Sequence, residues 1–350
     1  MSEYFIKDIK IENFKCFQSF QAKNLKRVNL IGGKNNVGKT AFMEACFIIS
    51  NYANKVSTNS KFSQNYGARA IDREWQFFEI IKSLLILQEN REGVEFYIKW
   101  IRGETKLSIG KDLTITLNDK FQINIYEDTI LPEYKYKNWS NYGNNCTISS
   151  FQENKYFYTI YQKNNPPLIT NTNFITPCNS DKTSLKDMID TLKLDDKYMV
   201  LVDILDKTFG ISGIDIIKNN VMLKQNSHFY NLNEYGDGIK HFVEIVLSLS
   251  VNENNIVYLD EVENGIHYSL FDKLWKIILE VSKELNVQVF ATTHSKECIE
   301  SYARVAKEIE EQDIAFMQLK RVSDGSIKAG VYENDAFFNA IEQEHEVRGW

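Results

Sequence analysis

Hydrophobic and polar positions near the start of the chain predict a strand, a loop and a helix. Residues 28–31 form a short apolar run that ends at two glycines, and apolar side chains recur at helical spacing between residues 40 and 49. Apolar residues within 9–14 indicate an earlier strand. The polar stretch at 51–70, rich in Asn and Ser, predicts a loop.

The middle of the chain changes period more than once. Residues 74–89 are amphipathic and predict a helix, whereas apolar and polar residues alternate from about 93 to 128, which indicates half-buried antiparallel strands. Helical spacing returns at 185–208, and short strands are expected at 214–232. The stretch 129–184 is aromatic and rich in Asn, and its pattern assigns no element.

Buried strands alternate with helices in the last third of the chain. The predicted elements are helices at 239–249 and 270–285, strands at 256–259 and 287–291, a strand–turn–strand around 324–325 and an acidic helical tail. Continuously apolar strands are typical of a sheet covered on both faces, and their alternation with helices predicts a parallel arrangement. We therefore expect an α/β protein.

Charge and composition narrow the functional classes. The 350 residues carry a net charge of -6, whereas a chain that binds nucleic acid over its whole surface is expected to be basic. No apolar run approaches the length of a membrane span and the first residues lack a signal-peptide pattern, so we expect a cytoplasmic protein that does not enter a membrane. The five cysteines form no CxxC pair, which argues against a zinc site.

The loop after the strand at 28–31 carries a phosphate-binding motif. Its sequence, Gly-Lys-Asn-Asn-Val-Gly-Lys-Thr, fits GxxxxGK[ST] without a gap. Backbone N–H groups of such a loop wrap phosphates, and the next helix points its positive end at the same anion. Lys39 is expected to neutralise the β- and γ-phosphates and Thr40 to ligate Mg²⁺. The residues expected to contact ATP are Gly33, Asn35, Asn36, Val37, Gly38, Lys39 and Thr40.

The strand at 256–259 ends in two acids that can complete such a site. Asp260 is expected to hold Mg²⁺, usually through water, and Glu261 to orient and deprotonate the attacking water as general base. The plain alternative is a strand that ends in two solvated carboxylates. The preceding phosphate loop favours the catalytic interpretation.

Two further segments fit the same site. His294 ends the next strand, where an imidazole can sense the γ-phosphate or hold the attacking water. Tyr235-Gly236-Asp237-Gly238 opens a helix whose N-terminus can attract an anion. Its glycines, Gly236 and Gly238, let another backbone approach and are expected to contact ATP. Asn233 and Lys240 are candidates to assist. The alternatives are a structural histidine and an ordinary helix start.

Together these segments resemble the ABC-ATPase superfamily: Walker A at 33–40, signature at 235–238, Walker B at 256–260, Glu261 and a switch histidine. The opening at 9–17, the Gly-Lys-Asn-Asn loop and Glu263-Asn264-Gly265-Ile266-His267 are similar to one branch of it. That branch holds the overcoming-lysogenization-defect (OLD) nucleases and the standalone ATPases of anti-phage systems such as Gabija, Septu and PARIS. The opening and the Gly-Lys-Asn-Asn loop are also typical of chromosome-segregation (SMC-like) and break-repair ATPases.

The resemblance implies an ABC-ATPase head with a P-loop parallel sheet core, an antiparallel β subdomain and a helical insert. We expect residues 1–50 and 230–335 to form the nucleotide-binding core, 51–229 an insert and 336–350 an acidic tail. Tyr235 departs from the family, which usually has a Ser there. Gln76 and Gln88 are both candidates for the glutamine that links the two lobes. Only 56 residues follow His294, so we expect no Toprim nuclease domain of the kind found in OLD nucleases.

The resemblance also implies how such a protein works. We expect an ATP-hydrolysing switch with Mg²⁺, in which two copies close head to tail on two ATP molecules as a homodimer or within a higher oligomer. A separately encoded effector is the expected partner, in a defence or DNA-processing complex, and DNA is a candidate ligand. The alternatives are a transporter-type ATPase subunit and a scaffold that binds ATP without hydrolysing it.

Overall fold

The computed structural model describes residues 5–58, the strands between residues 94 and 175, and residues 182–194, 198–251 and 256–342. The chain divides into two compact units. The first comprises Met1–Phe5, Lys23–Met43 and Asn171–Trp350, and the second comprises Ile6–Ala22 and Glu44–Thr170. Each unit is built around its own sheet.

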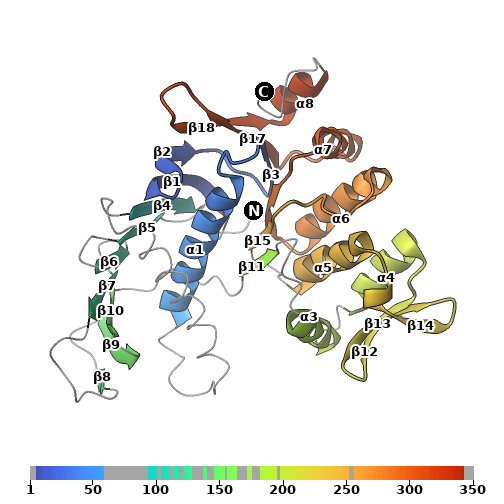
Figure 1. Cartoon of the computed structure of the whole chain (residues 1–350), viewed down its shortest axis with the longest axis horizontal. Coiled ribbons are helices and arrows are strands. Elements are labelled where there is room, and N and C mark those ends of the chain that lie inside the picture. The colour runs from blue at the N-terminus through green and yellow to red at the C-terminus, as the bar shows by residue number, and fades with distance from the viewer. Residues whose placement is uncertain are drawn as a thin grey trace. The chain divides into compact units, whose positions relative to one another are not determined.

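A mainly parallel sheet forms the centre of the first unit (Figure 1). Its order is β11 (Thr172–Ile175), β15 (Ile256–Leu259), β16 (Gln288–Thr292), β3 (Val28–Gly33), β17 (Ile314–Arg321) and β18 (Ile327–Glu333). All neighbouring strands pair in parallel except β17 and β18, which form an antiparallel hairpin. Every residue of β3, β15 and β16 is buried, as their apolar runs predict.

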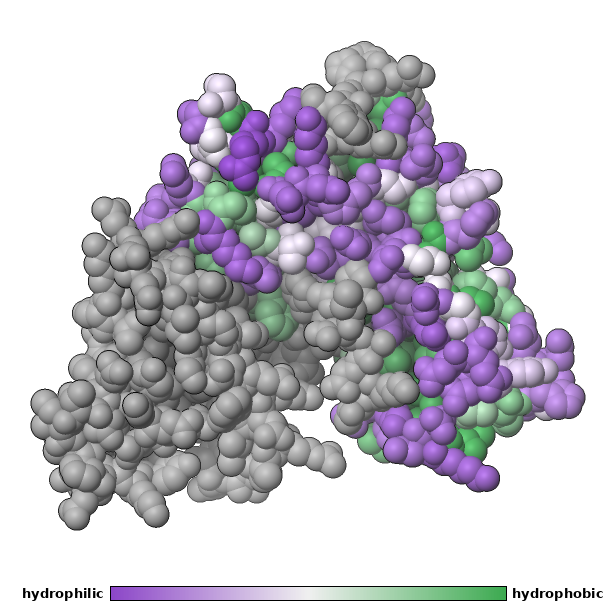
Figure 2. All heavy atoms as spheres, in the orientation of Figure 1, coloured by the Kyte–Doolittle hydropathy of each residue, from purple (hydrophilic) through white to green (hydrophobic). Residues whose placement is uncertain are grey.

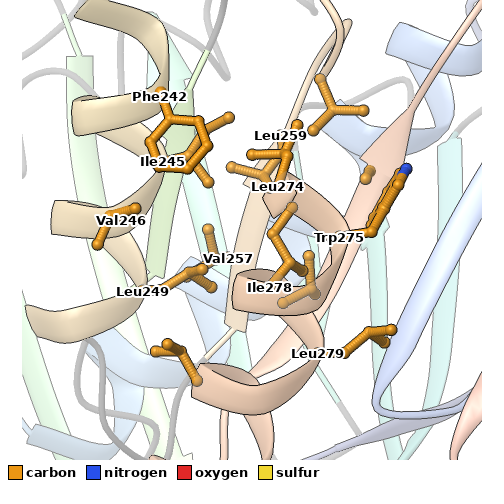
Figure 3. Packing of buried hydrophobic residues seen from close by; sticks show 14 of the residues in the cluster. Phe242, Ile245, Val246, Leu249, Val257, Leu259, Leu274, Trp275, Ile278 and Leu279 are labelled. Carbon is orange, nitrogen blue, oxygen red and sulfur yellow. The ribbon is translucent and has the colours of Figure 1, made fainter. Parts of the chain in front are cut away.

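Three amphipathic helices pack side by side against this sheet: α5 (Asp237–Val251), α6 (Phe271–Glu284) and α7 (Lys296–Glu308). Figure 3 shows the apolar side chains of α5 and α6 converging on Val257 and Leu259 of β15. Burial of each large apolar side chain stabilises the fold by about 1.5–3 kcal/mol. Trp275 is fully buried and its indole N–H donates to the carbonyl of Cys298 at 3.0 Å, which joins α6 to α7.

Smaller elements complete the first unit. They are α3 (Lys182–Leu194), α4 (Tyr198–Phe209), the antiparallel strands β12 (Gly213–Ile217), β13 (Asn220–Gln225) and β14 (His228–Asn231), the 3-10 turns η1 (Leu232–Glu234) and η2 (Tyr268–Leu270), and α8 (Asn334–Glu342). The first part of the predicted acidic tail is therefore α8, which is anchored by Phe337, fully buried against Phe316.

The second unit is organised by an antiparallel sheet (Figure 1). Its order is β2 (Phe17–Ala22), β1 (Ile6–Phe14), β4 (Val94–Trp100), β5 (Glu104–Ile109), β6 (Thr114–Leu117), β7 (Phe121–Glu127), β10 (Tyr156–Lys163), β9 (Cys146–Glu153) and β8 (Lys137–Trp139). The helix α1 (Lys39–Thr58) begins in the first unit and continues in the second.

The predicted α/β class with a parallel core and an antiparallel subdomain is confirmed. The alternation at 93–128 corresponds to β4–β7, and the helical spacing at 185–208 corresponds to α3 and α4. The loop predicted at 51–70 is wrong for 51–58, where α1 continues. That stretch contains no Gly or Pro, so a helix already nucleated propagates through it at little cost.

The domain boundaries predicted at residues 50 and 230 stay predictions, and the compact units group the chain differently. Residues 6–22 join the antiparallel strands, and the chain from 171 onward joins the parallel sheet. The helix predicted at 74–89 lies outside the described residues. On the face in Figure 2, the coloured residues are mainly hydrophilic. No helix in the described ranges is both long and apolar enough to span a membrane.

Candidate functional site

The phosphate-loop motif forms the turn between β3 and α1. Gly33 packs so closely on β17 that a Cβ there would lie 2.7 Å from the carbonyl oxygen of Leu319. Gly38 and Asn36 adopt positive φ angles of 98° and 60°, a conformation that favours Gly and, less strongly, Asn. The glycines and Asn36 are therefore required by the shape of the loop itself.

Lys39 lies folded into this loop. The residue is only 5% exposed, and its Nζ donates to the carbonyl oxygens of Gly33 at 2.8 Å and Lys34 at 2.9 Å. Burial lowers the pKa of Lys39 to about 8, although the neighbouring carboxylates, Glu263 foremost, oppose that shift. The ammonium is thus held by carbonyl groups that a phosphate could replace as its partner.

Thr40, Asp260 and Thr292 form a connected polar cluster. The Thr40 hydroxyl lies 3.1 Å from Asp260 Oδ2, and the Thr292 hydroxyl donates to Asp260 Oδ1 at 2.6 Å. Asp260 is buried. A hydroxyl beside one carboxylate is an oxygen set suited to Mg²⁺, which prefers one or two carboxylates with water and substrate phosphates. No group of three or more metal-binding side chains occurs among the residues that the structure describes.

Glu261 follows in an uncommon backbone conformation, with φ of 49°. Its N–H donates to the hydroxyl of Thr292 at 2.8 Å, so one threonine side chain fixes both acids of the Asp-Glu pair. The Glu261 side chain is 46% exposed, and its Oε1 lies 3.7 Å from Nε2 of His294. The Glu261 carboxylate is thus partly open to solvent.

His294 stands between the phosphate loop and Glu261. Its Nδ1 lies 3.2 Å from Nζ of Lys39. Burial, and secondly the charge of Lys39, lower the pKa of His294 below its usual value of 6.5, so the ring is neutral at pH 7 and can accept a proton. The structure therefore brings Lys39, Thr40, Asp260, Glu261 and His294 together. Their roles at the site stay predictions.

The glycines of the signature segment have different surroundings. A Cβ on Gly238 would lie 2.2 Å from the carbonyl oxygen of Gly265, whereas nothing lies within 4 Å of such an atom on Gly236. Gly238 therefore serves a close approach within this chain, and Gly236 faces open space. Asp237 between them is exposed and pairs with Lys240 at 3.1 Å.

Tyr235 and Asn233, which precede the signature glycines, form hydrogen bonds to residues of β13 and β14. The hydroxyl of Tyr235 donates to Gln225 at 3.3 Å, and the backbone N–H of Asn233 donates to the side chain of Asn231 at 3.0 Å. These contacts do not involve the phosphate loop. Both candidate glutamines, Gln76 and Gln88, lie outside the described residues.

Two residues of the site were not assigned a role from the sequence. Thr292 and Glu263 contact the predicted residues directly, since Glu263 Oε1 accepts the N–H of His294 at 2.7 Å. Their position in the sequence was the available indication. Thr292 ends the strand that follows the Asp-Glu strand, and Glu263 lies two residues after Glu261.

Parts of the amino-acid sequence resemble known proteins. Residues 178–299 match the model of an AAA ATPase domain. A Helicobacter pylori protein named ATP/GTP phosphatase is 25% identical over 344 residues, which cover 87% of this chain and 89% of the relative.

Solved structures resemble the fold. One contains an SMC head bound to the C-terminal winged-helix domain of ScpA; it has a TM-score of 0.56 and 10% identity, and it covers 97% of this chain and 99% of its own. The SMC head domain from Thermotoga maritima gives a TM-score of 0.48 with 12% identity over 94% of this chain and 99% of its own. The first of these structures shows that the fold is similar to that of an SMC head.

Proposed function

We propose that the protein hydrolyses ATP with Mg²⁺ at the cluster formed by the phosphate loop, Asp260 and His294. The observation that carries this proposal is the 3.1 Å approach of the Thr40 hydroxyl to Asp260 Oδ2, since it joins a phosphate-loop hydroxyl to the carboxylate that follows another strand of the same sheet, β15. Support also comes from the AAA ATPase match and from the Helicobacter pylori relative named as a phosphatase of ATP and GTP.

Each residue has a defined part in this proposal. Backbone N–H groups of residues 33–40 and the ammonium of Lys39 bind the phosphates. Thr40 and Asp260 would hold the Mg²⁺, which would offset negative charge on the phosphates. Glu261 takes a proton from the attacking water, and the neutral ring of His294 orients that water or contacts the γ-phosphate.

The proposed working state is a homodimer with ATP between the two copies. The open surroundings of Gly236 at the start of α5 support this, because a helix start with space beside it can receive the phosphates held by a second copy. Binding energy from such a shared ligand would favour the closed pair over separate copies. By analogy with SMC heads and anti-phage ATPases, closing in the cytoplasm would act on a separate effector, with DNA as a candidate ligand.

Release of phosphate from ATP and from GTP, each with Mg²⁺, tests the proposal. Lys39→Ala should abolish nucleotide binding, while Lys276→Ala, at an exposed position on α6, should leave it intact. Glu261→Gln should bind ATP but lose turnover by two or more orders of magnitude, with Glu284→Gln as the matched control.

Light scattering with ATP tests the pairing, which should persist longest in Glu261→Gln. If the wild-type protein binds ATP but releases no phosphate, the scaffold alternative replaces the enzyme. If Lys39→Ala binds ATP as tightly as the wild type, the assignment of the phosphate loop is wrong.

A further inference from the structure

A second carboxylate follows Glu261, and the proposed mechanism gives it no part. Glu263 accepts the backbone N–H of His294 through Oε1 at 2.7 Å. Its Oε2 atom is buried and has no hydrogen-bond partner among the described residues. An unpaired buried carboxylate oxygen reduces stability, so its presence calls for an explanation other than folding.

The hydrogen bond acts where the chain leaves β16. Just before it, Thr293 donates its N–H to the carbonyl of Ile31 in β3 at 3.0 Å. Just after it, the side chain of Ser295 caps α7 by accepting the N–H of Cys298 at 3.1 Å. His294 lies between these two anchors, and Glu263 binds its backbone N–H.

The position of this backbone decides what the imidazole reaches. The ring has one nitrogen 3.2 Å from Lys39 Nζ and the other 3.7 Å from Glu261 Oε1. The first distance lies within hydrogen-bond range and the second is somewhat longer. Rotation of the 294 peptide would move the ring relative to both partners. The charge of Glu263 also acts on both Lys39 and His294.

We propose that Glu263 is a positioning residue, which holds the backbone of His294 so that the imidazole lies between Lys39 and Glu261. The proposal rests on the ATPase function proposed above. Glu263 itself does not contact the reacting groups; its effect on turnover passes through His294. It should therefore affect kcat more than the affinity for ATP.

Two substitutions separate the hydrogen bond from the charge. Glu263→Gln keeps an acceptor for the N–H of His294, and it removes no hydrogen bond at Oε2 because that atom has none. Glu263→Met has a side chain of similar length but no comparable acceptor. Glu284→Gln and Glu284→Met, on the exposed end of α6, are the matched controls.

The expected result is a kcat that falls roughly 10- to 100-fold in Glu263→Met, the scale of one hydrogen bond to a charged group. In Glu263→Gln, kcat should stay at least about fivefold above that of Glu263→Met. The Kd for ATP should change less than about threefold in both variants. Equal losses of kcat in the two variants, or none in Glu263→Met, would overturn the proposal, as would a loss confined to ATP affinity.

A second measurement does not depend on turnover or on the stability of Glu263→Met. Selective ¹⁵N-histidine labelling gives one backbone amide signal for each of the 5 histidines, and His294→Gln identifies the signal of His294. Its proton should resonate downfield in the wild type and stay downfield in Glu263→Gln. An unshifted signal in the wild type refutes the positioning role, whereas a wild-type protein with the downfield signal but no phosphate release refutes only the proposed function.

Discussion

The pair Gly236 and Gly238 offers a sharp test, because one added methyl group should destabilise the protein at Gly238 and have little effect on stability at Gly236. In Gly238→Ala the new Cβ would lie 2.2 Å from the carbonyl oxygen of Gly265 and 3.3 Å from Cα of Ile266. Both are backbone atoms, so the contact cannot be relieved by a side-chain rotation. The turn at 263–266 or the start of α5 must move by about 1 Å to restore ordinary contact.

The expected cost follows from this overlap. Overpacking of a well-packed region destabilises a protein by about 1–3 kcal/mol. For Gly236→Ala the added atom meets nothing within 4 Å and the backbone φ is not positive. Alanine is a slightly poorer N-cap than glycine, which lowers stability, but it also reduces the conformational entropy of the unfolded chain, which raises stability. The two effects roughly offset each other, so the free energy of unfolding should change by no more than about 0.5 kcal/mol.

Thermal unfolding followed by circular dichroism measures the difference. Gly238→Ala should lower the melting temperature by roughly 2–8 °C, and Gly236→Ala by less than about 2 °C. If Gly236 contacts the nucleotide of a second copy, its alanine variant should lose ATP-dependent pairing while it keeps the wild-type melting temperature. Equal melting temperatures for both variants would refute the close contact between Gly238 and Gly265.

Three further outcomes are expected. Thr292→Val removes the hydroxyl that donates to Asp260 and accepts from Glu261, so phosphate release at fixed Mg²⁺ should fall roughly tenfold or more, and Thr292→Ser should restore most of it. Because the pKa of Lys39 is lowered to about 8, its ammonium form is lost above that pH. The affinity of the protein for ATP should therefore fall between pH 7 and 9. Calorimetry above pH 8 should detect the uptake of a proton when ATP binds. Asp272→Asn breaks the Asp272–Arg304 ion pair, but both side chains are more than half exposed, so the free energy of unfolding in denaturant should fall by less than about 1 kcal/mol. Arg304 lowers the pKa of Asp272, so this difference in stability should disappear as the pH falls below the usual pKa of 3.8.

The sequence predicted the elements whose evidence is local. Residues 33–40 carry a fixed spacing directly after a buried strand, and Asp260 and Glu261 end another such strand. Each of these segments can be recognised within about ten residues. The parallel sheet follows from their alternation with helices, because parallel strands need a crossover between them.

Elements that depend on distant partners were not predicted. β11 has only two apolar residues among its four, and it is defined by its pairing with β15, more than eighty residues later. Helix α7 was missed although Ser295 supplies its N-cap, since its buried face includes small or polar residues such as Cys298 and Ser301. For Glu263 the partner, His294, lies 31 residues away, and no periodic pattern links the two.

The order of the strands explains why the unassigned residues belong to the site. β16 lies between β15 and β3, so its carboxyl end is adjacent to the Asp-Glu pair on one side and the phosphate loop on the other. The Thr292 hydroxyl donates a hydrogen bond to Asp260, and the Thr293 N–H donates one to the carbonyl of Ile31 in β3. In a parallel sheet, ligands bind outside the carboxyl ends of strands. The middle strand must therefore carry the side chains that connect the two halves of the site, and a substitution at Thr292 or His294 should disturb both halves, whereas one at Asp260 or Lys39 disturbs its own half first.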